Sequence, residues 1–278
     1  MDLACRHIQV GDIRTQVWEG GSNQSRTVVL VHDGGYGSDA RSCWGTVLEL
    51  LSEQFHVVAP DLTGFGGTDK IYRFDVDPFI QRVGHLEKLG RALNIDSACF
   101  IGVSFGGAVV LRAAIERIPM LSAAVTISGT GGLFFEQERF AELQNYSPSI
   151  EGARRVWDLL ASSATAKQVE ERYHLSLIPG HWETLSAARL RNPAAEQPPD
   201  RLPLYRDALS KINVPVLLIA GSDDTLLEPS WEDKMASIIP GSVTRRFDGA
   251  RHEPQVDQPA EVAEVLIEFV TSKALGGD

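Results

Sequence analysis

The chain has 278 residues, of which 43% are hydrophobic and 23% are charged, and its formal net charge is −11 at pH 7. This composition suits one folded domain with a large core, and it excludes a disordered or membrane-spanning chain. The negative charge argues against nucleic acid or an anionic membrane surface as a partner. Three scattered cysteines indicate neither a disulfide framework nor a metal site. Because the N-terminus lacks a signal-peptide pattern, we expect a cytoplasmic protein with reduced thiols.

Runs with strand character alternate with helical stretches along the chain. The strand-like runs cover residues 9–18, 27–31, 55–59, 98–101, 123–127, 214–220 and 242–247. The helical stretches cover residues 44–51, 78–93, 108–114 and 259–270. This alternation predicts an α/β fold with a mostly parallel, doubly wound sheet that is covered on both faces. The first run is expected to belong to an antiparallel N-terminal hairpin.

A Gly-Val-Ser-Phe-Gly sequence at residues 102–106, followed by Gly107, is the most informative motif. It comes directly after the apolar run 98–101 and before the helix formers at 108–114. A G-x-S-x-G motif between a strand and a helix is typical of a nucleophile elbow, a strained turn that holds a serine hydroxyl clear of the backbone. We therefore expect Ser104 to be a nucleophile, with the glycines providing the clearance that the turn needs.

The alternation of strands and helices is interrupted between residues 132 and 204. This segment contains amphipathic helical stretches at 136–143, 152–162, 167–176 and 181–190. It ends in the proline-rich stretch 192–199. Because it is inserted between two core strands, we expect 132–204 to form a helical lid over the site, with 1–131 and 205–278 forming the core domain.

A serine nucleophile needs a base, and His252 is the histidine placed to act as one. It lies in a late loop, after the strand-like run at 242–247 and before the helical stretch at 259–270. In a fold that carries a nucleophile elbow, the base follows the serine and the acid along the chain.

The acid that would orient His252 is expected to be Asp224. The apolar run 214–220 is typical of a buried parallel strand, and Asp223 and Asp224 follow at its carboxyl end, where catalytic groups of parallel sheets lie. The residues that follow the preceding strand-like run, 128–130, contain no carboxylate. Spacing alone does not exclude Asp223.

An oxyanion hole would complete the site, because developing negative charge needs donors that are already in place. One donor should be the backbone N–H of Phe105, which follows the nucleophile. The other should come from the loop 32–35, which follows the strand-like run at 27–31. We assign this second donor to Gly34, with Gly35 as the alternative.

With these motifs in this order, the chain resembles the α/β-hydrolase superfamily, and most closely the meta-cleavage product hydrolases, which are C–C bond hydrolases of aromatic degradation. The resemblance is carried by the loop 57–69 and, more specifically, by the lid segment 171–180. It implies that Arg172 binds the carboxylate of a substrate. His181, Arg189 and Arg191 lie nearby in the sequence and could substitute for it. Gly35 and His181 are also candidate substrate-binding residues.

Three residues depart from the pattern of the meta-cleavage product hydrolases. That family usually has glycine in place of Asp33, asparagine in place of Val103 and tryptophan in place of Glu253. These departures leave the hydrolase prediction intact and put the C–C substrate in doubt. A buried Asp33 would have to be hydrogen-bonded or neutral. A serine at position 104 argues against epoxide hydrolases and haloalkane dehalogenases, which resemble this fold and place an aspartate there.

The sequence thus predicts a serine-dependent hydrolase of a small acyl compound, preferably one that cleaves a C–C bond in a vinylogous diketone acid. The alternatives are a carboxylesterase or lactonase with the same triad, a ligand receptor with low turnover, and a cofactor-free lyase or oxygenase. We expect a small-molecule substrate, no cofactor, no metal, and no nucleic-acid or membrane partner. The sequence leaves open which substrate is cleaved, whether an acyl-enzyme forms and whether the chain assembles into a homo-oligomer.

Overall fold

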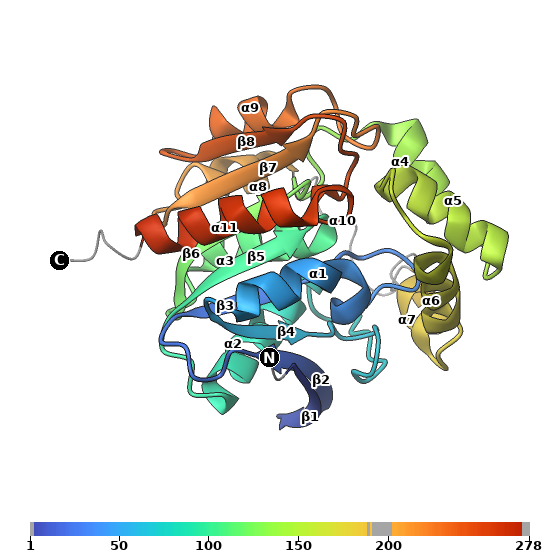
Figure 1. The fold of residues 1–278 in the computed structure, drawn as a ribbon, viewed down its shortest axis with the longest axis horizontal. Coiled ribbons are helices and arrows are strands. Elements are labelled where there is room, and N and C mark those ends of the chain that lie inside the picture. The colour runs from blue at the N-terminus through green and yellow to red at the C-terminus, as the bar shows by residue number, and fades with distance from the viewer. Residues whose placement is uncertain (1–2, 188–189, 191–201, 274–278) are drawn as a thin grey trace.

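The computed structural model describes residues 3–187, 190 and 202–273. An eight-stranded sheet in the order β1-β2-β4-β3-β5-β6-β7-β8 forms the centre of the molecule (Figure 1). The strands are β1 (Ala4–Val10), β2 (Ile13–Gly20), β3 (Thr27–Val31), β4 (His56–Pro60), β5 (Ala98–Val103), β6 (Leu121–Ile127), β7 (Val216–Gly221) and β8 (Val243–Phe247). β1 and β2 are antiparallel to their neighbours, and every pairing from β4 to β8 is parallel. The predicted α/β class with a mostly parallel sheet is confirmed.

Helices cover both faces of this sheet. The helices of the core are α1 (Ala40–Ser52), α2 (Pro78–Ala92), α3 (Phe105–Glu116), α8 (Leu202–Leu209), α9 (Trp231–Ala236), α10 (Pro254–Asp257) and α11 (Pro259–Lys273). Alternate residues of β3 belong to different cores: Val29 and Val31 pack on one face, and Val28 and Leu30 pack on the other. Because both faces are buried, the central strands are continuous apolar runs instead of alternating ones.

The N-terminal hairpin differs from the single strand predicted over residues 9–18. The chain turns at Gly11, which has φ +62°, so that this stretch contains the end of β1 and most of β2. A tight turn keeps the polar and apolar alternation in phase, and the pattern therefore does not reveal the break. The short helices α8, α9 and α10 were not predicted, because fewer than three turns give little periodicity.

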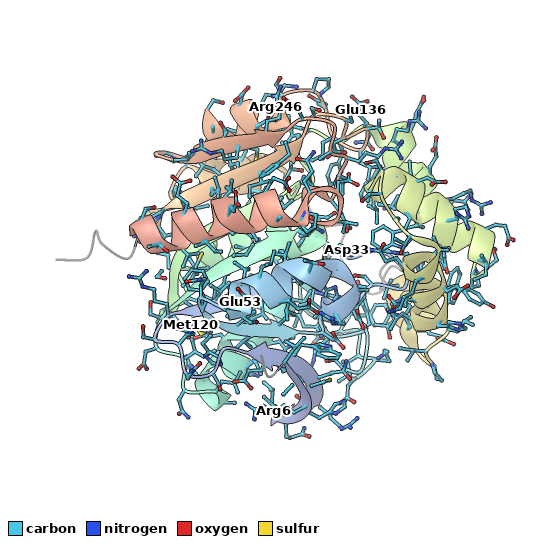
Figure 2. All side chains as sticks on the ribbon, viewed as in Figure 1. Arg6, Asp33, Glu53, Met120, Glu136 and Arg246 are labelled. Carbon is cyan, nitrogen blue, oxygen red and sulfur yellow. The ribbon has the colours of Figure 1, made fainter. Side chains whose placement is uncertain are left out.

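Four further helices, α4 to α7, lie together beyond the edge of the core, on the right in Figure 1. Their bounds are α4 (Gln137–Gln144), α5 (Ile150–Leu160), α6 (Ala166–Ser176) and α7 (His181–Ala187). Trp157 of α5 and Val169 of α6 are buried in a small separate core. Figure 2 shows Asp33 between the sheet layer and these helices, whereas Arg6, Glu136 and Arg246 lie at the periphery. The proline-rich stretch 192–199 lies outside the described residues.

No helix among the described residues combines the length and the apolar character needed to cross a membrane.

Candidate active site

Ser104 stands on a strained turn between β5 and α3. Its backbone has φ 52° and ψ −114°, a conformation that a non-glycine residue adopts only when the surrounding structure imposes it. A side chain at Gly102 would collide with the backbone of Gly106, and one at Gly106 would collide with the carbonyl group of Val31. The two glycines of the motif therefore allow the close packing that the elbow requires, as expected from the sequence.

The side chains of Ser104, His252 and Asp224 form one continuous chain of hydrogen bonds. His252 Nε2 lies 2.9 Å from Ser104 Oγ, and His252 Nδ1 lies 2.8 Å from Asp224 Oδ2. The tautomer that satisfies both contacts has Nδ1–H donating to Asp224 and Nε2 accepting from the serine hydroxyl. The His252 and Asp224 side chains are each only 3% exposed, so solvent does little to weaken their interaction. The site therefore brings together a hydroxyl, a base and an orienting carboxylate.

The structure places Asp224, and not Asp223, against His252. Asp224 accepts the N–H of Leu226 at 2.8 Å on Oδ1, which leaves Oδ2 for the histidine. Asp223 is exposed and accepts the neighbouring hydroxyl of Ser222 at 2.7 Å. Only Asp224 is in a position to orient His252.

The loop after β3 lies against the first residue of α3. A Cβ built on Gly34 would come within 2.7 Å of Phe105 Cβ, so only glycine allows this approach. Within the described part of the chain, the backbone N–H groups of Gly34 and Phe105 donate to no acceptor. Two N–H groups on adjacent segments beside a serine hydroxyl are the donors that an oxyanion hole requires.

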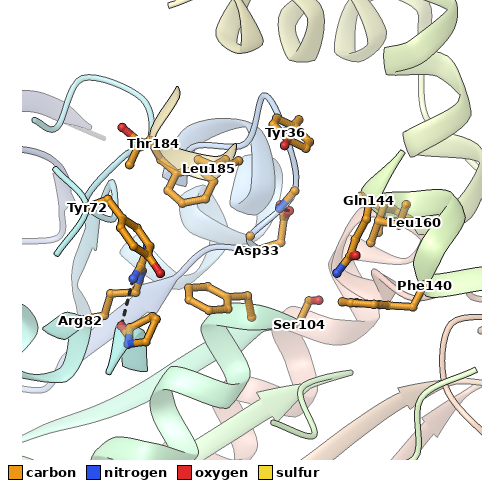
Figure 3. Close-up of a pocket in the computed structure, with 16 residues that line it drawn as sticks. Asp33, Tyr36, Tyr72, Arg82, Ser104, Phe140, Gln144, Leu160, Thr184 and Leu185 are labelled. Carbon is orange, nitrogen blue, oxygen red and sulfur yellow. Dashed lines mark hydrogen bonds between the residues drawn. The ribbon is translucent and has the colours of Figure 1, made fainter. Parts of the chain in front are cut away.

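A cavity of about 310 Å³ opens above Ser104. Its wall contains residues of the β3 loop, the first residue of α3, the start of α2 and the helices α4, α5 and α7. Figure 3 shows Ser104 near its middle, with Tyr72 and Arg82 toward one end and Phe140, Gln144 and Leu160 toward the other. Gly35 lines this cavity, as expected, and Arg172 and His181 are not part of its wall.

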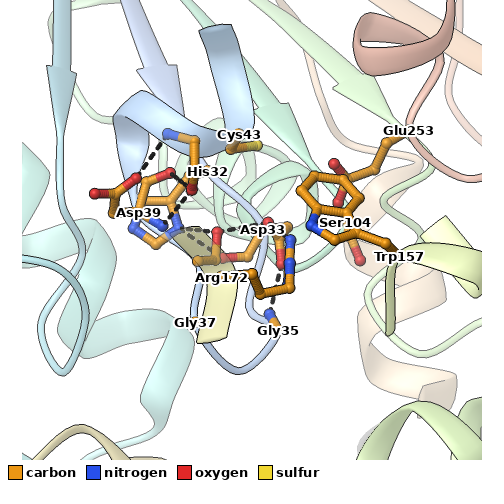
Figure 4. A network of polar contacts seen from close by, with 12 residues as sticks. His32, Asp33, Gly35, Gly37, Asp39, Cys43, Ser104, Trp157, Arg172 and Glu253 are labelled. Carbon is orange, nitrogen blue, oxygen red and sulfur yellow. Dashed lines mark hydrogen bonds and ion pairs between the residues drawn. The ribbon is translucent and has the colours of Figure 1, made fainter. Parts of the chain in front are cut away.

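Arg172, the expected carboxylate ligand, is fully buried behind the β3 loop (Figure 4). Its Nη2 lies 3.6 Å from Asp33 Oδ2, its Nη1 donates to the carbonyl oxygen of Tyr36 at 3.1 Å, and its guanidinium lies 4.3 Å from the ring centroid of Trp157. A Cβ on Gly35 would approach Arg172 Nη1 to 2.9 Å, so this glycine separates the guanidinium from the cavity. Arg172 is thus paired and closed off in this structure.

Asp33 is buried, and its carboxylate is surrounded by hydrogen-bond donors and a cation. Oδ1 accepts the N–H of Gly35 at 2.6 Å, and Oδ2 accepts the hydroxyl of Ser38 at 2.5 Å. Together with the nearby guanidinium of Arg172, these donors provide the hydrogen bonding that a buried aspartate was expected to need.

His181 connects two loops below the lid helices. Its Nε2 accepts the N–H of Gly37 at 2.9 Å, and its Nδ1–H donates to the carbonyl oxygen of Gly64 at 2.9 Å. Burial lowers the pKa of His181 to about 4, so the ring is neutral at pH 7. The two arginines offered as substitutes for Arg172, Arg189 and Arg191, lie outside the described residues.

A second buried group lies beside Asp33. Asp33, Cys43 and Glu253 place potential metal ligands within 4.8 Å of one another. Burial raises the pKa of the Cys43 thiol and, with help from the charge of Asp33, the pKa of the Glu253 carboxyl. Burial thus disfavours the thiolate and carboxylate forms that a metal ion requires as ligands, and Arg172 already provides a positive charge next to Asp33. These residues therefore do not suit a metal ion.

Several residues of the cavity wall were missed by sequence reasoning, notably Tyr72, Arg82, Phe140 and Leu160. Arg82 lies on a helix whose pattern is typical of ordinary amphipathic packing, and Tyr72 lies in an irregular segment. Neither has a motif that distinguishes a wall residue from a surface residue, so only the tertiary structure identifies them.

Comparisons with known proteins identify the family of this chain. The sequence profile of the Alpha/beta hydrolase family matches residues 28–265. The 2-hydroxy-6-oxo-2,4-heptadienoate hydrolase of Pseudomonas putida is 29% identical over 275 residues, which are 96% of each chain. The 2-hydroxymuconate semialdehyde hydrolase of a Pseudomonas species is 28% identical over 273 residues, covering 95% of this chain and 93% of that protein.

Solved structures share the fold at lower identity. A meta-cleavage product hydrolase from Pseudomonas fluorescens has a TM-score of 0.83 at 23% identity, covering 97% of this chain and 98% of that one. The carboxylesterase CesB from Bacillus subtilis has a TM-score of 0.79 at 16% identity, covering 97% and 92%. The family profile spans most of the chain, and the fold agrees with it. This protein is therefore a hydrolase that belongs to the alpha/beta hydrolase family.

Proposed function

We propose that this chain is a serine-dependent hydrolase that cleaves a C–C bond in a 2-hydroxy-6-oxo-2,4-dienoic acid, with Ser104, His252 and Asp224 as its catalytic triad. The continuous Ser104–His252–Asp224 contact at the floor of a cavity carries the proposal. The substrate class is supported by near full-length relatives whose names describe hydrolases of such acids.

The first task of the site is to move a proton within the substrate. A C–C bond breaks heterolytically only if the carbon that leaves has an electron sink. Transfer of the 2-hydroxyl proton to C5 converts the dienol into a 2-keto-3-enoate, which provides that sink. His252 is the group placed to carry this proton, because its Nε2 faces the cavity side of the triad and Asp224 stabilises the charged ring.

The second task is attack on the C6 carbonyl. Ser104 Oγ, or a water molecule activated by the Ser104–His252 pair, adds to C6 while its proton passes to His252 Nε2. The N–H groups of Gly34 and Phe105 would bind the resulting oxyanion. When the C5–C6 bond breaks, its electron pair enters the enone as a dienolate, which takes up the proton held by His252. If Ser104 was the nucleophile, a water molecule then releases the acyl group from the serine as a carboxylic acid, and if water was the nucleophile, the carboxylic acid is released directly.

The helices α4 to α7, which belong to the inserted segment, act as a lid in this proposal. Helices α4, α5 and α7 contribute to the cavity wall through Phe140, Leu143, Gln144, Leu160, Thr184 and Leu185. Most of these side chains are apolar, so they exclude water from the reacting atoms and provide an apolar surface for the acyl side of the substrate.

Turnover of two substrates tests the proposal. Purified protein is mixed with 2-hydroxy-6-oxohepta-2,4-dienoate, and the loss of dienolate absorbance and the release of acetate are followed. We expect both to occur, and kcat/KM to exceed that for p-nitrophenyl acetate by at least about a hundredfold. Hydrolysis of esters alone would indicate the carboxylesterase or lactonase function, and the absence of turnover with both compounds would indicate a ligand receptor.

A further inference from the structure

Arg82 is a buried cation in the wall of the catalytic cavity. It lies on α2, its residue is only 6% exposed, and its guanidinium lies 4.9 Å from the ring centroid of Phe105, the residue next to the nucleophile. Burial lowers the pKa of Arg82 to about 10, so the side chain still carries its positive charge at pH 7. A positive charge therefore lies next to the ring of Phe105, close to the Ser104 nucleophile.

The hydrogen-bonding capacity of Arg82 is largely unused. Among the described residues it donates one hydrogen bond, from Nη1 to the carbonyl oxygen of Pro78 at 2.9 Å, and it forms no ion pair. Its Nε is buried without a partner. The neighbouring carboxylate of Asp77 accepts the N–H groups of Phe79 and Ile80 as the N-cap of α2. A buried cation with unused donors is costly to maintain unless a ligand binds it.

The second arginine near the cavity, Arg172, also has buried nitrogens without a hydrogen-bond partner, Nε and Nη2, but it differs in its charge partner and in its position. Arg172 is paired with Asp33, donates to Tyr36 and lies behind Gly35. An anion in the cavity would have to displace Asp33 to reach it, whereas Arg82 forms part of the wall itself. Of the two guanidinium groups, Arg82 is the one that a ligand meets first.

The cation lies at one end of the cavity. In Figure 3, Tyr72 and Arg82 lie together at that end, and Phe140, Gln144 and Leu160 lie at the other, mostly apolar end, with Ser104 between the two ends. A ligand with an anionic group at one end, a carbonyl near its middle and an apolar group at the other end matches this order.

We propose that Arg82 binds the carboxylate of the substrate, so that the acid part of the molecule extends over Phe105 toward Tyr72 and α2. This inference rests on the proposed function for its substrate, and it assigns the anion to a residue of the core domain instead of the lid arginine. A guanidinium can bind a carboxylate through two parallel N–H···O bonds, which would fix the orientation of the ligand as well as its position.

Binding of a substrate-like acid without a cleavable bond tests the proposal separately from catalysis. Sorbate, which is hexa-2,4-dienoate, is compared with the neutral sorbamide by isothermal titration calorimetry. We expect the wild-type protein to bind sorbate at least about tenfold more tightly than sorbamide, and Arg82→Gln to bind the two equally. Arg82→Lys, which keeps the charge and loses the planar fork, should show an intermediate preference.

Arg91→Gln is the matched control, because Arg91 lies on the same helix, is 74% exposed and pairs with Glu87 in solvent. It removes the same charge from the same helix and should keep the full preference for sorbate. A preference that survives in Arg82→Gln, or that is absent in the wild type, would overturn the assignment. Cleavage of the dienoic acid is measured separately, so a failure of the proposed reaction does not obscure this result.

Discussion

Replacing Asp224 by asparagine should nearly abolish catalysis while leaving the fold in place. In the wild type, Oδ1 accepts the N–H of Leu226 and Oδ2 accepts the Nδ1–H of His252, each at 2.8 Å. An asparagine has only one acceptor oxygen. If that oxygen keeps the N–H of Leu226, the amide NH₂ faces His252 and selects the tautomer with a proton on Nε2, which cannot accept a proton from Ser104.

The size of the loss follows from the role of the tautomer. In triads of this type, the wrong tautomer lowers kcat by about 10⁴-fold, which corresponds to about 5.5 kcal/mol of barrier. The Asp224 and His252 side chains are each 3% exposed, so bulk water cannot easily take the place of the carboxylate. We therefore expect a loss of kcat/KM between about 10³-fold and 10⁴-fold for any substrate that the wild type cleaves.

Steady-state kinetics of Asp224→Asn and Asp223→Asn provide the assay, with circular dichroism to verify folding. Asp223 is exposed, and its side chain accepts the hydroxyl of the neighbouring Ser222, so its variant should stay within about twofold of the wild type. The reasoning would be refuted if Asp223→Asn lost most of its kcat/KM while Asp224→Asn kept a tenth of the wild-type value.

Four further outcomes are expected. Ser104→Ala should lose at least about a thousandfold in kcat/KM without a large change in melting temperature, and retention of a tenth would exclude the serine mechanism. Arg172→Gln leaves Asp33 buried without its cation, so urea unfolding should show a free energy of unfolding about 3 kcal/mol lower than that of the wild type. An unchanged stability together with a kcat/KM that falls for acidic substrates alone would instead assign Arg172 to substrate binding. Burial lowers the pKa of His85 to about 4, below that of an exposed histidine. The unfolded chain therefore binds the proton first, and the free energy of unfolding falls as the pH is lowered from about 7 toward 4. Over this range, the free energy of unfolding of His85→Gln should decline less than that of the wild type. Thiol titration should find one reactive cysteine, Cys5, in the native protein and three after denaturation, since Cys43 and Cys99 are buried.

The parts of the site that depend on local geometry were predictable from the sequence. The elbow needs glycines at fixed positions between a strand and a helix, and this pattern is written in consecutive residues. The order of Ser104, Asp224 and His252 follows from the order of the strands, because each residue comes just after the carboxyl end of a parallel strand. Spacing left Asp223 and Asp224 open, since only the local turn decides which of two neighbouring carboxylates faces the histidine.

The parts that depend on contacts between distant segments were decided by the tertiary structure. Asp33 and Arg172 lie far apart in the chain, and they pair because α6 packs against the loop after β3. That contact buries the guanidinium that the lid motif indicated as a ligand. Arg82 has no motif, and it lines the cavity because α2 places it beside Phe105. Sequence periodicity identifies the buried face of a helix, but which buried side chain borders a cavity depends on how the surrounding elements pack.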